Sequence, residues 1–192
     1  MRRRELLTLL GASTLRGAVS RDSEIAAWIR TQGGEAQLRA DGRLVRASLA
    51  YTWVNDTDMR NLEPALALES LDLSATTITY RGLARLKPLP AVRNLRLFYT
   101  EFVVDTAMAQ IRHWDRLESL VLQGTDITDT SLEYVGNYSN LRSLDISFTQ
   151  ITDNGLEYLG DLSKIEELVL GGNKVSGAGL PVIQLLPRLR RL

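Results

Sequence analysis

The chain has 192 residues, which is enough for one domain with a continuous hydrophobic core. Its 23 lysine and arginine residues balance 23 aspartate and glutamate residues, so no overall charge steers it towards nucleic acid or anionic lipid. The absence of cysteine excludes disulfides, thiolate metal sites and a cysteine nucleophile, and it is compatible with either redox compartment.

Residues 1–21 fit either an export signal or a disordered segment. Arg2 to Arg4 precede a leucine-rich stretch, and Ala18-Val19-Ser20 is an acceptable cleavage site, as in a twin-arginine signal. Against export, the apolar stretch is short and Arg16 interrupts it. It is also far below the ~20 apolar residues of a membrane span, so no stable span is expected. The localisation stays open, with the cytoplasm favoured.

Residues 22–43 are expected to cap the N-terminal end of the core. Asp22 or Ser23 is available as the N-cap of a helix, and Gly33-Gly34 ends that helix. Asp41-Gly42 predicts a hairpin turn between two strands. The apolar face of the predicted helix consists of Ile25, Trp28 and Ile29.

A repeated unit occupies residues 44–192. Successive units are 24 residues long, except that the third has one extra residue, and a truncated seventh unit begins at residue 189. A fixed period of this length predicts a solenoid, in which each unit buries its apolar face against neighbours on both sides. The six complete units, numbered repeats 1 to 6, begin at Leu44, Leu68, Val92, Leu117, Leu141 and Ile165.

Each unit opens with LxxLxL, an alternation that suits a short strand with its leucines inward. We assign the polar column that follows to hydrogen bonding of the turn backbone: Thr52, Thr76, Thr100, Thr125, Thr149 and Asn173. Helix N-caps are expected at Thr79, Thr128, Thr152 and Ser176. Carboxylates that favour the positive end of a helix lie near these starts, at Asp56, Asp105, Asp129 and Asp153.

The second half of each unit is apolar at every third residue. This spacing predicts one face of a short helix or helical turn that packs on the strand layer. The triplets are Met59, Leu62 and Ala65; Leu83, Leu86 and Leu89; Met108, Ile111 and Trp114; Leu132, Val135 and Tyr138; Leu156, Leu159 and Leu162; and Leu180, Ile183 and Leu186.

The phrase LxxLxLxxTxITDxGLxxLxxL resembles the leucine-rich repeats common in bacterial proteins. It is also similar to the repeats of F-box-type receptors, in which cysteine usually holds the threonine position. The resemblance covers about three quarters of the chain. It implies an α/β fold, a right-handed leucine-rich-repeat solenoid shaped as a short horseshoe. Its parallel β-sheet is concave, its short helices are convex, and a helix and hairpin cap the N-terminal end.

No sequence pattern points to catalysis, a cofactor or a metal. The only histidine, His113, is expected on the outer surface near Asp115, as a solvated residue. Neither GxSxG, a phosphate-binding glycine loop nor HExxH is present. Calcium needs six to eight oxygen ligands, and one aspartate per turn supplies too few, so helix capping is the better explanation of the aspartate row. We therefore expect a protein that is not an enzyme and has no cofactor.

Aromatic residues alternate with small ones two positions past the third leucine of each unit, at Tyr51, Ala75, Tyr99, Gly124, Phe148 and Gly172. Exposed aromatics mixed with arginine are typical of binding hot spots, although rings that pack on their own neighbours are an open alternative. The predicted partner-binding residues of the concave face are Tyr51, Trp53, Asp72, Arg96, Phe98, Tyr99, Asp145 and Phe148.

We expect a protein–protein interaction module that binds a protein or peptide on its concave face. The mixed charge of that face disfavours nucleic acid, which calls for a basic stripe. One alternative is a substrate-receptor subunit of a ubiquitin-ligase-like complex, which the F-box resemblance implies although the chain has no F-box-like helical segment. A second alternative is a structural repeat protein that self-associates through the uncapped edge of its last repeat.

Overall fold

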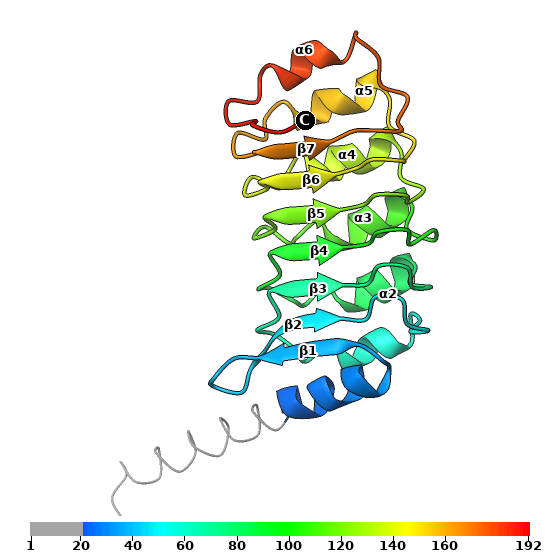
Figure 1. Cartoon of the computed structure of the whole chain (residues 1–192), viewed down its shortest axis with the longest axis vertical. Coiled ribbons are helices and arrows are strands. Elements are labelled where there is room, and N and C mark those ends of the chain that lie inside the picture. The colour runs from blue at the N-terminus through cyan, green and yellow to red at the C-terminus, as the bar shows by residue number, and fades with distance from the viewer. Residues whose placement is uncertain (1–20) are drawn as a thin grey trace, which may run out of the picture.

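The computed structural model describes residues 21–192, in which seven strands form one sheet in the order β1 to β7 (Figure 1). The first two strands are antiparallel, and every later neighbouring pair is parallel. The strands are β1 (Glu35–Leu38), β2 (Leu44–Ser48), β3 (Ser70–Asp72), β4 (Asn94–Arg96), β5 (Ser119–Val121), β6 (Ser143–Asp145) and β7 (Glu167–Val169).

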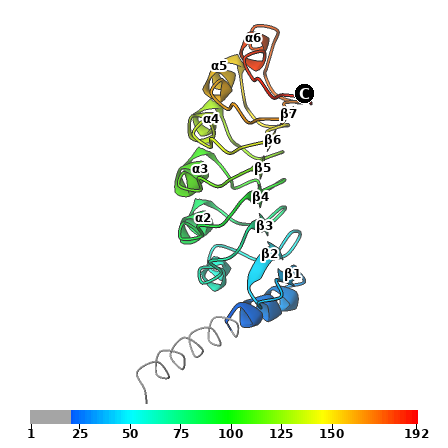
Figure 2. The ribbon, with the colours of Figure 1, turned by 90° about the vertical axis from the view of Figure 1, so that its left-hand side faces the viewer.

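Short helices form a second layer, and Figure 2 shows them on the outer side of a gentle arc whose inner side is the sheet. Residues 21–31 form a further helix at the N-terminal end of the described chain. The α/β solenoid with a concave sheet, predicted from the repeat, is therefore confirmed. The outer elements are η1 (Asp58–Asn61), α2 (Tyr80–Arg85), α3 (Asp105–Ile111), α4 (Asp129–Val135), α5 (Asp153–Leu156), η2 (Glu157–Leu159) and α6 (Leu180–Ile183).

The strands pair so that equivalent residues of successive repeats lie side by side. Leu71 pairs with Leu95, and Leu95 pairs with Leu120 although repeat 3 is one residue longer. The extra residue therefore lies outside the sheet. Beyond β7, an isolated parallel bridge joins Glu167 to Arg191 and begins the next step of the same ladder.

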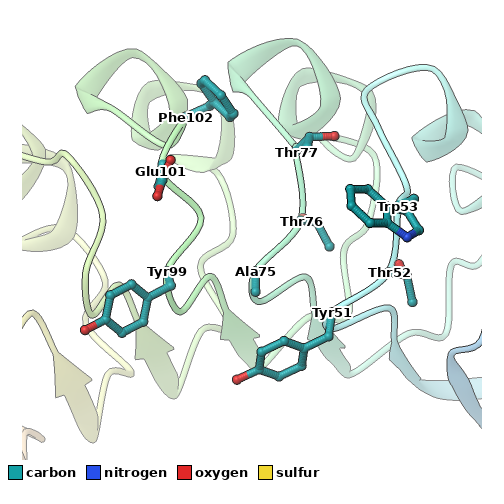
Figure 3. A pocket seen from close by; sticks show the side chains of 9 residues that line it. All are labelled: Tyr51, Thr52, Trp53, Ala75, Thr76, Thr77, Tyr99, Glu101 and Phe102. Carbon is teal, nitrogen blue, oxygen red and sulfur yellow. The ribbon is translucent and has the colours of Figure 1, made fainter.

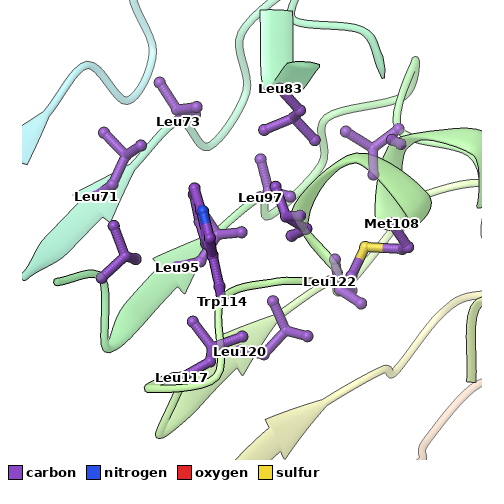
Figure 4. Close-up of a cluster of buried hydrophobic side chains, with 14 of the residues drawn as sticks. Leu71, Leu73, Leu83, Leu95, Leu97, Met108, Trp114, Leu117, Leu120 and Leu122 are labelled. Atoms are coloured by element: carbon purple, nitrogen blue, oxygen red, sulfur yellow. The ribbon is translucent and has the colours of Figure 1, made fainter. Parts of the chain in front are cut away.

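The core runs continuously between the two layers. Strand leucines such as Leu71, Leu95 and Leu120 are fully buried, and Figure 4 shows them with Met108 and Trp114. Burying one such leucine side chain stabilises the fold by about 1.5–3 kcal/mol. All members of the predicted triplets are buried except Leu180, which is 44% exposed. That expectation was wrong because α6 belongs to the last complete repeat, so among the described residues no further helix packs over it, and its buried residue is Ile183.

The polar column has the structural role that the sequence predicted. The hydroxyls of Thr52, Thr76, Thr125 and Thr149 each donate to the carbonyl three residues earlier, at 2.6–2.8 Å. Thr100 donates to Leu73 of the preceding repeat at 3.2 Å, and the Asn173 amide donates to Ile146 and Leu170. These side chains satisfy turn carbonyls that no strand neighbour reaches.

A row of aspartates links the helix starts of neighbouring repeats. The carboxylate of Asp129 accepts hydrogen bonds from the N–H and the hydroxyl of Thr152, at 2.8 and 2.6 Å. The Thr152 hydroxyl in turn accepts from the N–H of Asn154 and caps α5. In this row, called the aspartate ladder below, Asp56, Asp105 and Asp153 bind Thr79, Thr128 and Ser176 in the same way.

The aspartate ladder also explains the glycine of the ITDxGL phrase. A Cβ atom on Gly155 would lie 2.2 Å from Oδ1 of Asp129, so a side chain there would displace the carboxylate. The predicted N-caps at Thr79, Thr128 and Thr152 are confirmed, whereas Ser176 is not the cap of α6. Residues 177–179 form a turn that contains two glycines, which are poor helix formers, and α6 begins only after it.

One step of the aspartate ladder is missing, between repeats 2 and 3. Tyr80 stands in place of the aspartate, and Val104 stands in place of the hydroxyl N-cap. Ala107 occupies the position held elsewhere by glycine or serine. As a result, α3 has no side-chain N-cap. The three changes go together, because the aspartate binds the hydroxyl N-cap and the glycine or serine leaves room for the carboxylate.

The N-terminal helix and hairpin cover the first repeat. Ile25, Ala26 and Ile29 are buried in the same core cluster as Leu44. Asp22 was expected at the helix N-cap, but it lies inside the helix of residues 21–31, as does Ser23. Its buried carboxylate accepts a hydrogen bond from the N–H of Leu44 at 2.8 Å instead, which ties the helix to β2.

The prediction of an export signal falls on residues that lie, apart from residue 21, outside the described part of the chain. Among residues 21–192, no helix is both long enough and apolar enough to cross a bilayer.

Candidate functional site

The alternating aromatic column has an unusual backbone conformation. Its φ angles are 58° at Tyr51, 48° at Tyr99 and 54° at Phe148, and the small residues between them are also left-handed. A residue with a Cβ atom costs about 1–2 kcal/mol in this region, whereas glycine adopts it freely. The chain therefore holds three aromatic residues at positions where glycine is the unstrained choice.

Cross-repeat hydrogen bonds hold this conformation in place. The N–H of Tyr51 donates to the Ser74 carbonyl at 2.9 Å, and the N–H of Tyr99 donates to the Gln123 carbonyl at 2.8 Å. Ala75, between them, donates to Phe98 at 2.8 Å. The ladder of the sheet thus continues past the strand ends and keeps neighbouring repeats about 4.8 Å apart along the column.

Two of the aromatic rings pack against the next repeat. A Cβ atom on Gly124 would lie 2.9 Å from Cδ1 of Tyr99, and one on Gly172 would lie 2.6 Å from Cδ1 of Phe148. The alternation therefore has a steric cause, because a ring in one repeat excludes a side chain in the next. Even so, Tyr99 is 49% and Phe148 is 58% exposed, so both rings keep a free surface.

A groove of about 320 Å³ lies where the strands of repeats 1 to 3 turn towards the helices (Figure 3). We call it the loop groove. Its floor consists of small residues of repeat 2: Ala75, Thr76 and Thr77. Residues of repeats 1 and 3 stand on either side of this floor: Tyr51, Thr52 and Trp53, and opposite them Tyr99, Glu101 and Phe102. Trp53 is 91% exposed and Tyr51 is 74% exposed, so the first wall is almost entirely uncovered aromatic surface.

Two exposed residues of this site, Glu101 and Phe102, were missed by the sequence prediction. In other repeats a single residue separates the polar column from the next buried position, as Thr77 separates Thr76 from Ile78. Repeat 3 has two residues there, and the second is Phe102, which is 55% exposed. The extra residue of repeat 3 could have indicated Phe102. Because the sheet keeps neighbouring repeats in register, an inserted residue lies in a loop rather than in a strand.

A second depression, of about 280 Å³, lies beside the loop groove on the strand face. We call it the concave hollow. It brings together five of the predicted binding residues: Tyr51, Asp72, Arg96, Phe98 and Asp145. Tyr51 lines both depressions, and the Phe98 ring meets the Tyr99 ring edge-on, with centroids 4.5 Å apart. Phe148 lines neither depression.

The charged groups of the concave hollow are engaged within the array. Nε of Arg96 lies 3.3 Å from Oδ2 of Asp72, and Asp72 also accepts from the N–H and hydroxyl of Ser74. Asp145 accepts the same two bonds from Ser147. Exposed ion pairs of this kind contribute about 0–1 kcal/mol, so they organise the face more than they stabilise it. Tyr51, at 74% exposure, supplies the aromatic surface of this hollow.

The carboxylates of the aspartate ladder are also occupied by hydrogen bonds within the fold. Burial raises the pKa of Asp105, but hydrogen bonds from Ser131 and Thr128 outweigh that effect and hold the pKa below its ordinary value. Hydrogen bonds from Ser176 likewise lower the pKa of Asp153. Within residues 21–192, no group of three or more His, Asp or Glu side chains is placed to hold a metal ion. His113 is exposed and receives a hydrogen bond from Arg112, at 3.2 Å.

Comparisons with known proteins agree on the architecture. The family model described as a leucine-rich repeat matches residues 139–160. An internalin (InlF) from Listeria monocytogenes str. 4b F2365 superposes with a TM-score of 0.59 and 21% identity, covering 69% of this chain and 36% of its own. Internalin C2 from the same strain gives 0.56 and 22%, covering 89% and 82%.

A further solved structure, PEPR1–AtPEP1, gives a TM-score of 0.53 and 16% identity, and covers 82% of this chain and 25% of its own. The present chain therefore spans about a third of the internalin InlF structure and a quarter of PEPR1–AtPEP1. No curated protein sequence matches it. At these identities the likeness concerns the fold.

Proposed function

We propose that this chain, a leucine-rich-repeat solenoid, is a protein-interaction module that binds a protein or peptide through the loop groove and the adjoining concave hollow. The observation that carries the proposal is the gathering of exposed aromatic rings around one groove, with Trp53 91% and Tyr51 74% exposed. Aromatic residues in a depression are the usual anchors of protein interfaces, because they bury a large area with few rotatable bonds.

The backbone strain of the aromatic column supports the same proposal. Glycine at the positions of Tyr51 and Tyr99 would remove a cost of about 1–2 kcal/mol per residue, and repeats 4 and 6 do use glycine there. Strained residues are typical of functional sites, where side-chain identity matters more than stability. The rings of Tyr51 and Tyr99 therefore have a use beyond the fold.

The fold comparisons support the class of function without naming a partner. Parallel solenoids of this kind present one extended surface built from equivalent positions of many repeats. PEPR1, which shares the fold, is paired with AtPEP1 in its solved structure. Side chains at the loop groove and concave hollow, rather than the common backbone, are what would select the partner of this chain.

The proposal is tested by affinity capture from a lysate followed by mass spectrometry. The variant Trp53→Asp/Phe102→Asp places charge on both walls of the loop groove without touching a left-handed or buried residue. A matched control is Tyr158→Asp, which charges an aromatic residue of η2 that is 46% exposed on the helix side. Circular dichroism first establishes that all three proteins have the same fold.

We expect the wild type and the Tyr158→Asp control to capture the same partner, and the groove variant to lose at least about nine tenths of it, because tenfold weaker binding corresponds to ~1.4 kcal/mol. Equal capture by all three proteins would refute the loop groove as the binding surface. A captured ligase scaffold would favour the substrate-receptor alternative. A molecular mass that rises with concentration would favour the self-assembling one.

A further inference from the structure

We infer that the loop groove binds a proline-rich segment in the polyproline II conformation, followed by a basic residue. This inference rests on the function proposed above and specifies the partner of the same surface. It follows from the spacing of the rings, the shape of the groove, the use already made of its backbone groups, and the position of its charge.

The spacing of the rings matches one turn of a polyproline II helix. Tyr51 and Tyr99 lie two repeats apart, joined through Ala75 by sheet-like hydrogen bonds. Two strand spacings amount to about 9.6 Å. A polyproline II helix has three residues per turn and rises ~3.1 Å per residue, so it repeats every ~9.3 Å. Prolines at every third position of such a segment would therefore meet equivalent places beside successive rings, with Phe148 two repeats further on.

The cross-section of the groove suits proline. Walls of aromatic rings at repeats 1 and 3 flank a floor of Ala75, Thr76 and Thr77, the smallest residues of the site (Figure 3). A segment that runs along the array crosses these walls, and the gap of ~9.6 Å between their backbones admits one side chain at a time rather than a whole α-helix, which is about 10–12 Å across. A pyrrolidine ring is narrow and flat, and aromatic-lined grooves take polyproline II segments because these lose little conformational entropy on binding.

The backbone N–H groups along the aromatic column are already paired. The N–H groups of Tyr51, Ala75 and Tyr99 already donate to carbonyls of the next repeat. An added β-strand needs unpaired backbone groups at its docking edge, whereas a polyproline II segment is recognised through ring faces and has no N–H at its prolines. A segment that lies along the aromatic column therefore contacts it through side chains and does not require a hydrogen-bonded ladder.

The charge of the groove lies at one end. Glu101 belongs to the wall of repeat 3, and Asp126 holds the equivalent loop position of repeat 4. Both are exposed, and neither forms an ion pair with any cation in residues 21–192. The equivalent residues of repeats 1 and 2, Trp53 and Thr77, carry no charge. A basic residue beyond the proline segment would complement this end and fix the direction of binding.

The inference is tested by fluorescence anisotropy with synthetic peptides and the full chain. The probe peptide carries a fluorescent label, three Pro-Pro-Leu triplets and two arginines. One control peptide has Gly-Ser in place of each Pro-Pro pair, which keeps the leucines and the charge but removes the polyproline II preference. A second control ends in two glutamates instead of two arginines.

We expect saturable binding of the probe peptide, with at least about tenfold weaker binding of both control peptides. The groove variant Trp53→Asp/Phe102→Asp is expected to lose the probe, while Tyr158→Asp retains it. The variant Glu101→Lys/Asp126→Lys is expected to reverse the preference, so that the glutamate-ended peptide binds more tightly than the arginine-ended one. This reversal separates charge recognition from a loss of folding, which would abolish binding of every peptide.

Equal binding of the Gly-Ser peptide would overturn the proline-rich assignment, and an unchanged preference in Glu101→Lys/Asp126→Lys would overturn the basic residue. If the probe does not bind while capture of the natural partner still depends on Trp53 and Phe102, the inference about the partner is wrong and the proposed function stands. If capture does not depend on these two residues either, both proposals are wrong.

Discussion

At the scale of single residues, the conflict between backbone conformation and side chain is sharpest at Tyr51. Its φ of 58° favours glycine. Its ring is 74% exposed, so burial of the ring contributes little stabilising free energy to offset the backbone strain. Gly124 and Gly172 hold the equivalent position in two other repeats, so the solenoid accepts glycine there. A strained residue whose ring is exposed is typical of a functional site, because the fold gains little from that side chain.

Replacing Tyr51 with glycine is therefore expected to leave the free energy of unfolding unchanged or to raise it by up to about 1 kcal/mol. The relief of left-handed strain offsets the greater entropy of glycine in the unfolded chain. The same variant should weaken partner binding. Urea denaturation followed by circular dichroism measures the first effect. A loss of stability of more than ~1 kcal/mol would show that the Tyr51 ring is needed by the fold.

At the scale of elements, the aspartate ladder shows how a helix start is built by two repeats. Asp129 belongs to α4, yet its carboxylate holds the N-cap residue of α5, and Gly155 leaves room for it. The sequence predicted the aspartates as helix-start charges, which is a local effect. Their hydrogen bonds to the next repeat were missed because their partners lie 23 residues away in the sequence.

Restoring the missing step of the aspartate ladder should stabilise the protein. The variant Tyr80→Asp/Val104→Thr/Ala107→Ser copies the working set of Asp105, Thr128 and Ser131. A restored N-cap is worth about 0.5–2 kcal/mol, so we expect a gain of ~1 kcal/mol in urea denaturation. The control Val104→Thr supplies the N-cap hydroxyl without the aspartate and should stabilise the protein by less than the triple variant does. A triple variant no more stable than this control would contradict the cross-repeat capping.

The lowered pKa of Asp105 predicts a specific pH dependence of stability. Because the pKa in the folded chain is below the unfolded value of about 3.9, the ionised carboxyl stabilises the fold at all pH values above ~4. This contribution disappears as the pH falls through the folded pKa. We expect Asp105→Asn to show a flatter decline of unfolding free energy below pH ~4 than the wild type, whereas Asp126→Asn, at an exposed loop position, keeps the wild-type slope. Identical slopes for the two variants would contradict the assignment.

At the scale of the whole molecule, one core connects every described repeat. Leu120 lies in β5, between β4 and β6, and is fully buried. Leu120→Ala is expected to lower the free energy of unfolding by about 2–5 kcal/mol, since it leaves a cavity between two repeats. The control Leu66→Ala, at a position 57% exposed, should have an effect below ~0.5 kcal/mol.

The same variant tests cooperativity. The chain has three tryptophans, Trp28, Trp53 and the buried Trp114, so a Trp28→Phe/Trp53→Phe background leaves Trp114 as the fluorescent reporter of the core. Unfolding followed by far-ultraviolet circular dichroism and by tryptophan fluorescence should have one midpoint in Leu120→Ala as in the parent. Two separate midpoints would show that the repeats on either side of Leu120 unfold independently.

The solenoid, its inward leucines, the polar column and most of the helix starts could be predicted from the sequence, because each follows from a pattern that recurs at every repeat. Five of the predicted binding residues, Tyr51, Asp72, Arg96, Phe98 and Asp145, line one hollow in the fold, and their role in binding stays a prediction. The folded chain was needed to see that Tyr51 and Trp53 face Tyr99 and Phe102 across the small residues of repeat 2, while Phe148 is not part of the loop groove.

The physical reason is that a repeat pattern reports what all units share, namely burial and local hydrogen bonding. The loop groove depends on what they do not share: the left-handed φ of an aromatic residue, the one extra residue of repeat 3, and contacts between repeats two steps apart. These features arise when the sheet sets the register between repeats, so they become visible only in the folded chain.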